Sequence, residues 1–333
     1  MEQKNKRKWR RKLMLVLKII LIISVLSMSI GALLHATLFR AKLSAIAPYG
    51  ELVNVGDGQM HVYSLGEGID TIVLLPGLGI PLPSADFGPL MRKLAEDYRV
   101  ITIEYFGVGF SSVTDAERTS AQFVDEIRGA LSALNIDTPV ILMPHSISTV
   151  YAEHYATLNP EAVKAIISLD GTSTAYYAET PKILNAILPI VKFQQSLGAT
   201  SILSGLVVNK SKSMAAGYTE KEINDIVTFS GFSMNDNTLE QMRTSGETIK
   251  EVMDLPFPES VAYFKIISKD TFEKPNKQLK ISPQDYQFEH LKRIGDHAIY
   301  EVLEGNHFIY HYNEGRISEI VAEVLADLQE TKK

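Results

Sequence analysis

The pattern of apolar and polar positions predicts a body in which short buried strands alternate with amphipathic helices. Four continuous apolar runs are typical of strands that are buried on both faces. They lie at residues 71–75, 99–104, 139–143 and 163–169. Helical periodicity separates them at 86–97, 119–134 and 147–158. Strands that alternate with helices favour right-handed crossovers, so we expect an α/β fold with a mostly parallel sheet covered by helices on both faces.

The pattern changes twice along the body. Residues 51–56 and 59–65 predict a strand pair, because the Asp57-Gly58 step between them favours positive φ. From residue 172 to residue 255 two amphipathic stretches, 181–208 and 219–254, replace the strands. Strand patterns return at 261–267 and 298–303, before a last helix at 316–329. We therefore predict an α/β core formed by 50–171 and 256–330, with a helical cap inserted at 172–255.

A long apolar segment precedes this body. Residues 13–34 read LMLVLKIILIISVLSMSIGALL, in which Lys18 is the only charge. At about 1.5 Å per residue, such a helix is as long as a bilayer's hydrocarbon core is thick. We predict one uncleaved transmembrane anchor at 13–36. The alternatives are a cleaved signal peptide, which should have a shorter apolar region, and a buried core helix, which should have a polar face.

Charge and composition restrict the compartment and the partners. The first twelve residues contain seven basic side chains and one acidic one, although the whole chain has a formal net charge of −6. The positive-inside rule predicts a cytoplasmic tail at 1–12 and places everything after Arg40 outside the cell membrane. The acidic body should repel nucleic-acid phosphates, so we expect no nucleic-acid partner. The absence of cysteine excludes disulfides, thiolate catalysis and cysteine-based metal sites.

Candidate chemistry lies after the strands, because ligands of open α/β sheets bind at the carboxyl ends of the strands. The run Pro144-His145-Ser146-Ile147-Ser148 follows one strand and leads directly into a helix. A serine on such a sharp turn projects its hydroxyl above the sheet. This run resembles the G-x-S-x-G elbow of the α/β-hydrolase family, although Pro144 and Ser148 stand in place of the two glycines.

Two further segments carry the same resemblance, which covers residues 50–330. The run 75–79, LPGLG, lies where the family has its oxyanion loop, and 104–111, EYFGVGFS, is similar to the family's D-x-x-G-x-G-x-S run. The resemblance implies an α/β-hydrolase fold with a helical cap, and a serine hydrolase that needs no metal or organic cofactor. Glu104 is then expected to tie loops together near the site.

The family's order of serine, acid and histidine implies the site residues. Ser146 is the expected nucleophile, and His307, after the last strand, is the expected general base, with His311 as its alternative. Asp270 is the expected acid, with Asp170 as the alternative. His145 is expected to pack or to form hydrogen bonds rather than to react. The backbone N–H groups of Leu78 and Ile147 are the expected oxyanion donors.

The predicted function is the hydrolysis of a carboxylic ester through an acyl-serine intermediate, with a small-molecule ester or amide as substrate. One alternative is an amide hydrolase resembling prolyl aminopeptidases, which would need acidic cap residues such as Glu220, Glu222 or Asp225 to hold an amine. Another is a hydrolase fold that binds a partner without catalysis. The apolar segment 183–208 is expected to cover a lipophilic pocket, to pack on the core, or to do both.

Overall fold

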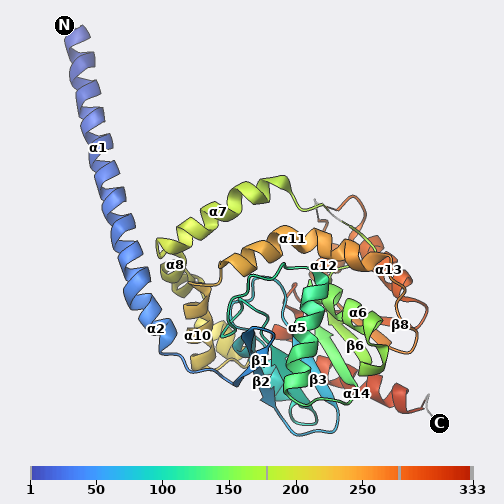
Figure 1. Ribbon diagram of the computed structural model, residues 1–333. Helices are drawn as coiled ribbons and strands as arrows, with labels where there is room; N and C mark the ends of the chain where they lie inside the picture. The colour runs from blue at the N-terminus through green and yellow to red at the C-terminus, as the bar shows by residue number, and fades with distance from the viewer. Residues whose placement is uncertain (1, 178, 277–278, 331–333) are drawn as a thin grey trace.

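The computed structural model describes residues 2–177, 179–276 and 279–330, and its centre is one eight-stranded sheet (Figure 1). The strands are β1 Glu51–Val55, β2 Gly58–Leu65, β3 Thr71–Leu75, β4 Arg99–Ile103, β5 Val140–Pro144, β6 Val163–Leu169, β7 Ala262–Ser268 and β8 Ala298–Leu303. Their order in the sheet is β1-β2-β4-β3-β5-β6-β7-β8. The β1–β2 and β2–β4 pairs are antiparallel and the other five pairs are parallel, which confirms the predicted α/β fold class.

Helices cover both faces of the sheet, and this explains why the central strands are continuously apolar. In β3, Val73 and Leu75 pack on one face, whereas Ile72 and Leu74 pack on the other. Successive side chains of a strand point to opposite faces, so both sets must be apolar when both faces are buried. The first face is covered by α5 Ser120–Ala133 and α6 Ser148–Leu158, and the second by α4 Gly88–Leu94 and α14 Glu314–Glu330.

The predicted helical insertion contains more helices than the two amphipathic stretches indicated. They are α7 Lys182–Ser196, α8 Ala199–Val207, α9 Lys210–Ala215, α10 Glu220–Ser230 and α11 Asp236–Met253. The break between α7 and α8 falls at Gly198, whose φ of 74° lies in the left-handed region that glycine enters freely. Helix α10 starts at a capping box formed by Thr219 and Glu222. Residue 178 of the predicted insertion lies outside the described residues.

Three other differences concern short elements. The predicted helix at 86–97 is replaced by α3 Pro83–Asp86 and α4, each of which has a proline in its first turn. Two helices that were not predicted, α12 Lys269–Glu273 and α13 Pro283–Ile294, lie between β7 and β8. Short 3-10 turns, η2 Pro160–Ala162 and η3 Ile309–His311, precede β6 and α14.

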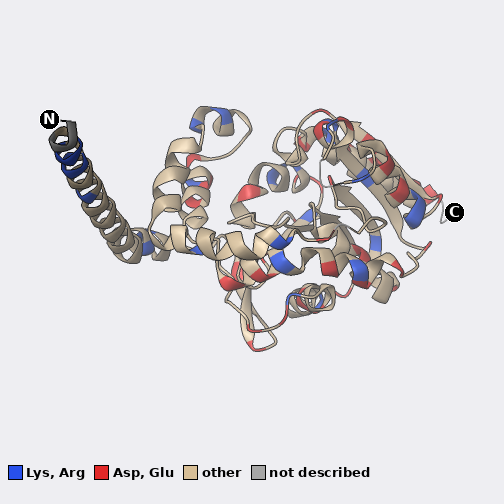
Figure 2. Ribbon diagram, turned by 90° about the horizontal axis from the view of Figure 1, so that it is seen from above, with Lys and Arg blue, Asp and Glu red and all other residues tan. Residues whose placement is uncertain are grey.

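The N-terminal segment is one long helix that leaves the body (Figure 1). It consists of α1 Glu2–Leu34, the π-helical η1 His35–Phe39 and α2 Arg40–Ser44. Its basic residues cluster toward its N-terminal end (Figure 2). The helix is long and apolar enough to cross a membrane, and none of its apolar window is buried in the protein. It is longer than the predicted 13–36 span at both ends, while residue 1 of the predicted tail lies outside the described residues.

Candidate active site

Ser146 lies on the sharp turn between β5 and α6. Its φ is 56°, a left-handed conformation that a residue with a side chain rarely adopts. The turn is held by backbone bonds, since Ser146 N–H donates to the Leu169 carbonyl over 3.2 Å and His145 N–H donates to the Leu75 carbonyl over 2.9 Å. Pro144 pairs with Leu75 at the end of β5, where the ladder bond comes from His145. Because His145 donates this bond, the missing N–H of Pro144 removes no hydrogen bond from the turn.

The turn brings the Ser146 hydroxyl to the imidazole of His307. The distance from Ser146 Oγ to His307 Nε2 is 2.9 Å. His307 follows β8, and its side chain is 45% exposed, so solvent and a substrate can reach it. The other ring nitrogen, Nδ1, lies 2.7 Å from Asp170 Oδ2. A carboxylate can only accept a hydrogen bond, so Nδ1 of His307 carries the ring proton. Nε2 of His307 is then free to accept a proton from the serine.

Asp170 directly follows β6 and is held rigidly. Its φ is 47°, and the residue is 3% exposed. Oδ1 accepts the Ser268 N–H over 2.8 Å, while Oδ2 accepts the Thr271 hydroxyl over 2.7 Å in addition to the imidazole. These donors from β7 and α12 fix the carboxylate in the orientation that selects one tautomer of His307.

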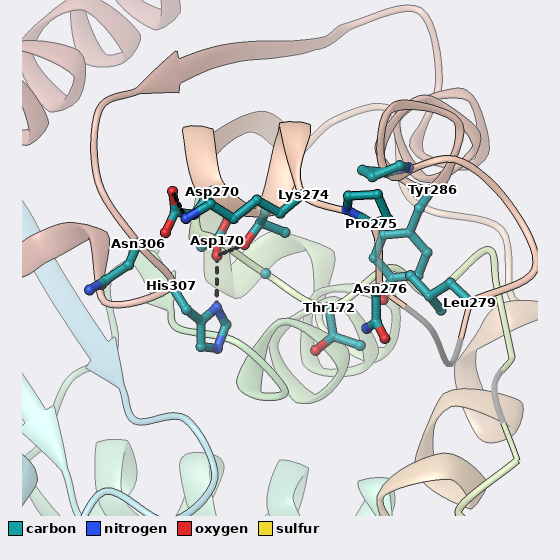
Figure 3. Close-up of a pocket in the computed structure, with 13 residues that line it drawn as sticks. Asp170, Thr172, Asp270, Lys274, Pro275, Asn276, Leu279, Tyr286, Asn306 and His307 are labelled. Atoms are coloured by element: carbon teal, nitrogen blue, oxygen red, sulfur yellow. Dashed lines mark hydrogen bonds and ion pairs between the residues drawn. The ribbon is translucent and has the colours of Figure 1, made fainter.

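Asp270, the acid expected from the sequence, does not lie against His307. It lies in the first turn of α12, where its carboxylate forms an ion pair with Lys274 over 2.7 Å. Figure 3 shows the Asp270 carboxylate turned toward Lys274, whereas His307 faces Asp170. The physical reason is that β7 ends at Ser268, which caps α12, so Asp270 is carried along a helix instead of remaining at a strand end. The prediction is wrong in this respect, and its alternative, Asp170, takes the position.

His311, the alternative to His307, is directed elsewhere. Its Nε2 lies 3.5 Å from Asp86 Oδ1, and its ring stacks on Phe308 at 5.3 Å between centroids. The serine therefore has His307 as its imidazole partner.

The loop after β3 lies against the elbow. A Cβ built on Gly77 would lie 2.5 Å from the buried His145 Nδ1 and 3.0 Å from the Ser146 Cβ, so this position needs a residue without a side chain. Among the described residues, neither the Leu78 N–H nor the Ile147 N–H has a hydrogen-bond partner. Free backbone donors beside a nucleophile are the arrangement that an oxyanion requires, and these are the two expected from the sequence.

The buried side chain of His145 contacts the backbone of His307. Its Nε2 lies 2.9 Å from the backbone carbonyl oxygen of His307. Burial and the nearby His307 lower the pKa of His145 to about 4, so the ring is neutral at pH 7. A carbonyl oxygen can only accept a hydrogen bond, so the Nε2–H group of His145 is the donor. This bond links the turn that contains Ser146 to the backbone of His307.

Glu104 joins two loops near the site, as expected. It is fully buried at the end of β4. Oε1 accepts the Ser84 N–H over 3.0 Å, and Oε2 accepts the Phe110 N–H over 2.7 Å. The Glu104 carboxylate therefore accepts backbone N–H groups from two different segments and holds them together.

A cavity of about 720 Å³ opens beside His307 (Figure 3). Its wall is mixed, with charged and polar groups such as the Asp270–Lys274 pair and Thr172 together with Pro275, Leu279 and the ring of Tyr286. Its volume is typical of a site for a small organic molecule. Within the part of the chain that the structure describes, no group of three or more histidine, aspartate or glutamate side chains is placed to hold a metal ion.

The acidic cap residues considered for amine binding already have partners. Glu222 forms a bond of 2.6 Å with Arg92, and Asp225 accepts the Tyr49 hydroxyl over 2.8 Å. Glu220 lies on the exposed side of α10, 3.9 Å from Lys210. These contacts are structural, and none of the three lines the cavity beside His307.

Comparison with known proteins agrees with the observed fold. The family model described as the alpha/beta hydrolase fold matches residues 70–197. An uncharacterized protein of Bacillus subtilis (strain 168), YbdG, is 28% identical over 282 residues, which is 83% of this chain and 85% of that protein. Among solved structures, a putative epoxide hydrolase from Pseudomonas aeruginosa superposes with a TM-score of 0.64 at 16% identity, covering 85% of this chain and 97% of that one. The enol-lactonase from Burkholderia xenovorans LB400 does so with a TM-score of 0.60 at 15% identity, covering 83% and 100%.

Proposed function

The chain has the α/β-hydrolase fold, and on that premise we propose that it is a membrane-anchored serine hydrolase that cleaves a carboxylic ester. The observation that carries the proposal is the continuous chain of hydrogen bonds from Ser146 through His307 to Asp170, with lengths of 2.9 Å and 2.7 Å. A serine hydroxyl is a weak nucleophile at neutral pH and needs a base that a third group orients.

In the proposed reaction, Ser146 Oγ attacks the ester carbonyl while its proton moves to His307 Nε2. Asp170 stabilises the imidazolium that forms, and the N–H groups of Leu78 and Ile147 bind the oxyanion. The imidazolium then gives its proton to the departing alkoxide, which leaves an acyl group on the serine. A water molecule activated by His307 attacks this acyl-serine and releases the carboxylic acid, which restores the free hydroxyl.

The rival functions have less support. An aminopeptidase-like activity needs an unpaired acid in the cap, but Glu222 and Asp225 are engaged with Arg92 and Tyr49. A purely binding role would not require the strained φ of 56° at Ser146, which costs about 1–2 kcal/mol for a residue with a side chain. Strain of this kind is retained where the surrounding structure serves a function.

We assign the apolar part of α1 to the membrane span and place the body outside the cell membrane. The support is the length and composition of the helix and the seven basic residues before it. A signal peptide passes the same composition test, but here the helix continues without a break through η1 into α2 and packs against the body at Gly31 and His35.

One experiment tests both parts of the proposal. A charged fluorophosphonate that does not cross membranes is applied to intact cells expressing the full chain or Ser146→Ala. We expect the parent to be labelled in the membrane fraction and the variant to lose labelling by at least 100-fold. Equal labelling of both, or none of the parent even after lysis, would remove the serine hydrolase. Labelling of the parent only after lysis would keep the enzyme and reverse the orientation.

A further inference from the structure

Helices α7 and α8 present an apolar face to the outside of the molecule. On α7 the exposed apolar residues are spaced three or four apart, which places them on one side of the helix. They are Ile183, Ile187, Ile190 and Phe193. On α8 the corresponding face is formed by Ile202, Leu203, Leu206 and Val207, of which the last two are 77% and 81% exposed. We call these eight residues the outer cap face.

The inner side of the same helices includes polar groups. Gln195 is buried and its Oε1 accepts the Met234 N–H over 2.9 Å, while the Ser204 hydroxyl donates to the Val227 carbonyl over 3.2 Å. A helix on the surface of a water-soluble domain normally has its apolar stripe inward and its polar side outward. On α7 the inward side is formed by Leu188 together with Gln195, so this helix already buries an apolar side chain against the body. The outer cap face is therefore a second apolar side, one that water solvates poorly.

The turn between α7 and α8 packs directly on the long N-terminal helix. A Cβ built on Gly198 would lie 2.7 Å from the Gly31 carbonyl oxygen, so two glycines allow the backbones to touch. One turn further along, the His35 ring stacks on Phe232 at 4.4 Å between centroids. In Figure 1, α1 departs beside α8, and α7 runs across the side of the body toward which α1 points.

This contact fixes the depth of the outer cap face. Gly31 lies three residues before Leu34, the end of the apolar run, which corresponds to roughly 5 Å at 1.5 Å per residue. The α7–α8 turn therefore lies about 5 Å inside the outer end of this apolar run. Amphipathic helices that lie in a membrane interface are buried to a depth of about 5–10 Å.

We propose that the outer cap face is embedded in the outer leaflet of the membrane that holds α1, so that the body is attached through two surfaces instead of one. This inference rests on the proposed anchoring of α1. The outer cap face continues the apolar surface of α1, and the contact between Gly31 and Gly198 joins the cap to that helix. The cap is then a fixed part of the membrane attachment and holds the core at one orientation to the bilayer.

The absence of cysteine allows a direct test on the full chain. Single cysteines are introduced as Ile190→Cys and Leu206→Cys, labelled with an environment-sensitive nitrobenzoxadiazole dye, and reconstituted in phosphatidylcholine vesicles with or without nitroxide-labelled lipid. The matched control is Ile69→Cys, a 96% exposed aliphatic residue in the β2–β3 loop. We expect nitroxide lipid to quench the two cap labels at least threefold and the control label by less than a fifth.

A label at Leu21→Cys, in the middle of the span, separates the inference from its premise. If Leu21 is quenched by nitroxides deep in the acyl region and the cap labels are not, α1 crosses the membrane and the outer cap face does not enter it. If Leu21 is not quenched either, the anchoring fails and the inference fails with it. Blue-shifted emission of the cap labels without quenching would indicate cover by protein, such as a second copy of the chain, and would also overturn the inference.

Discussion

Ser146 and Asp170 are both held at positive φ, at 56° and 47°, on neighbouring strand ends. Such conformations cost about 1–2 kcal/mol each for residues with a side chain. Each is stabilised by bonds to the next strand, because Ser146 N–H donates to Leu169 and Asp170 N–H donates to Ile266 over 2.8 Å. The sheet thus holds both functional side chains above its edge, in conformations that a free chain would rarely adopt.

The choice between the two candidate acids gives the sharpest prediction for single residues. Asp170→Asn should lower kcat/KM for a p-nitrophenyl ester by about 10⁴-fold, because an amide no longer selects the tautomer of His307 that leaves Nε2 free. The change is nearly isosteric, so the fold should persist, which circular dichroism can verify.

The matched control for this prediction is Asp270→Asn. It removes an exposed ion pair with Lys274 on the cavity wall and leaves the contact between Asp170 and His307 in place, so kcat should change by less than threefold. A large loss in Asp270→Asn together with a small loss in Asp170→Asn would show that the carboxylates exchange roles in the working enzyme.

At the scale of elements, the buried carboxylate of Glu153 on α6 bonds to several other parts of the core at once. Oε1 accepts the Tyr263 hydroxyl over 2.7 Å and lies 2.8 Å from His290 Nε2, while Oε2 accepts the Thr174 hydroxyl over 2.6 Å and Arg293 Nη1 over 3.1 Å. Burial by itself raises the pKa of Glu153, but the attraction of Arg293 and of His290 once that ring is protonated, with hydrogen bonds from His290 and Thr174, outweighs it and lowers the pKa to about 2. The helix that follows the nucleophile is therefore fixed to β7 and α13.

Replacing the Glu153 carboxylate should destabilise the folded protein. Glu153→Gln should lower the free energy of unfolding by about 3 kcal/mol, because it leaves the guanidinium of Arg293, whose side chain is only 11% exposed, without its carboxylate partner. Urea unfolding followed by circular dichroism measures the loss, and Glu161→Gln, at an exposed position after the same helix, should cost less than about 0.5 kcal/mol. Equal costs for both variants would mean that the network does not stabilise the fold.

The sequence predicts the strands and the large helices better than the short elements. Continuous apolar runs such as 71–75 identify strands buried on both faces, because helices pack on each face of the sheet and every residue of the strand is then covered. Helix α13 has few apolar positions. The clear sequence indication of its start is Ser282 as N-cap, followed by Pro283 at the first helical position. Helix α12 is five residues long, too short to show periodicity.

The same short helix explains why the acid could not be assigned from the sequence. Asp170 and Asp270 each follow a strand, and β6 and β7 are neighbours, so a carboxylate from either is expected at the same edge. The turn at Asp170 and the helix at Asp270 decide which one reaches His307. Two features of the sequence bear on this choice. Gly171 after Asp170 is typical of a turn, and Lys274 four residues after Asp270 is the spacing of an ion pair on a helix. Ser146 and His307 follow their strands directly, and their approach was predicted.

For the molecule as a whole, buried histidines link stability to pH. Burial, with like charges nearby, lowers the pKa of His145 and of His290 to about 4 each, from 6.5. Between pH 6.5 and 4 the unfolded chain therefore binds protons that the folded chain does not, so stability falls as pH falls through this window. At about 1.4 kcal/mol per pKa unit, each histidine accounts for up to roughly 3 kcal/mol. Glu153, with its pKa lowered to about 2, adds to the loss only below its ordinary value of 4.5.

We therefore expect the melting temperature of the detergent-solubilised chain to be lower at pH 4.5 than at pH 7, with the decline starting near pH 6.5. His145→Gln keeps a donor for the His307 carbonyl but removes one titrating ring, so its decline over this window should be about half as steep. Differential scanning fluorimetry at half-unit pH steps measures both slopes. A parent curve that is flat from pH 7 to 4.5 would show that the two rings are not held neutral in the fold. An unchanged slope in His145→Gln would assign the effect to the other buried histidines of the body, His290 and His154, whose pKa values burial also lowers.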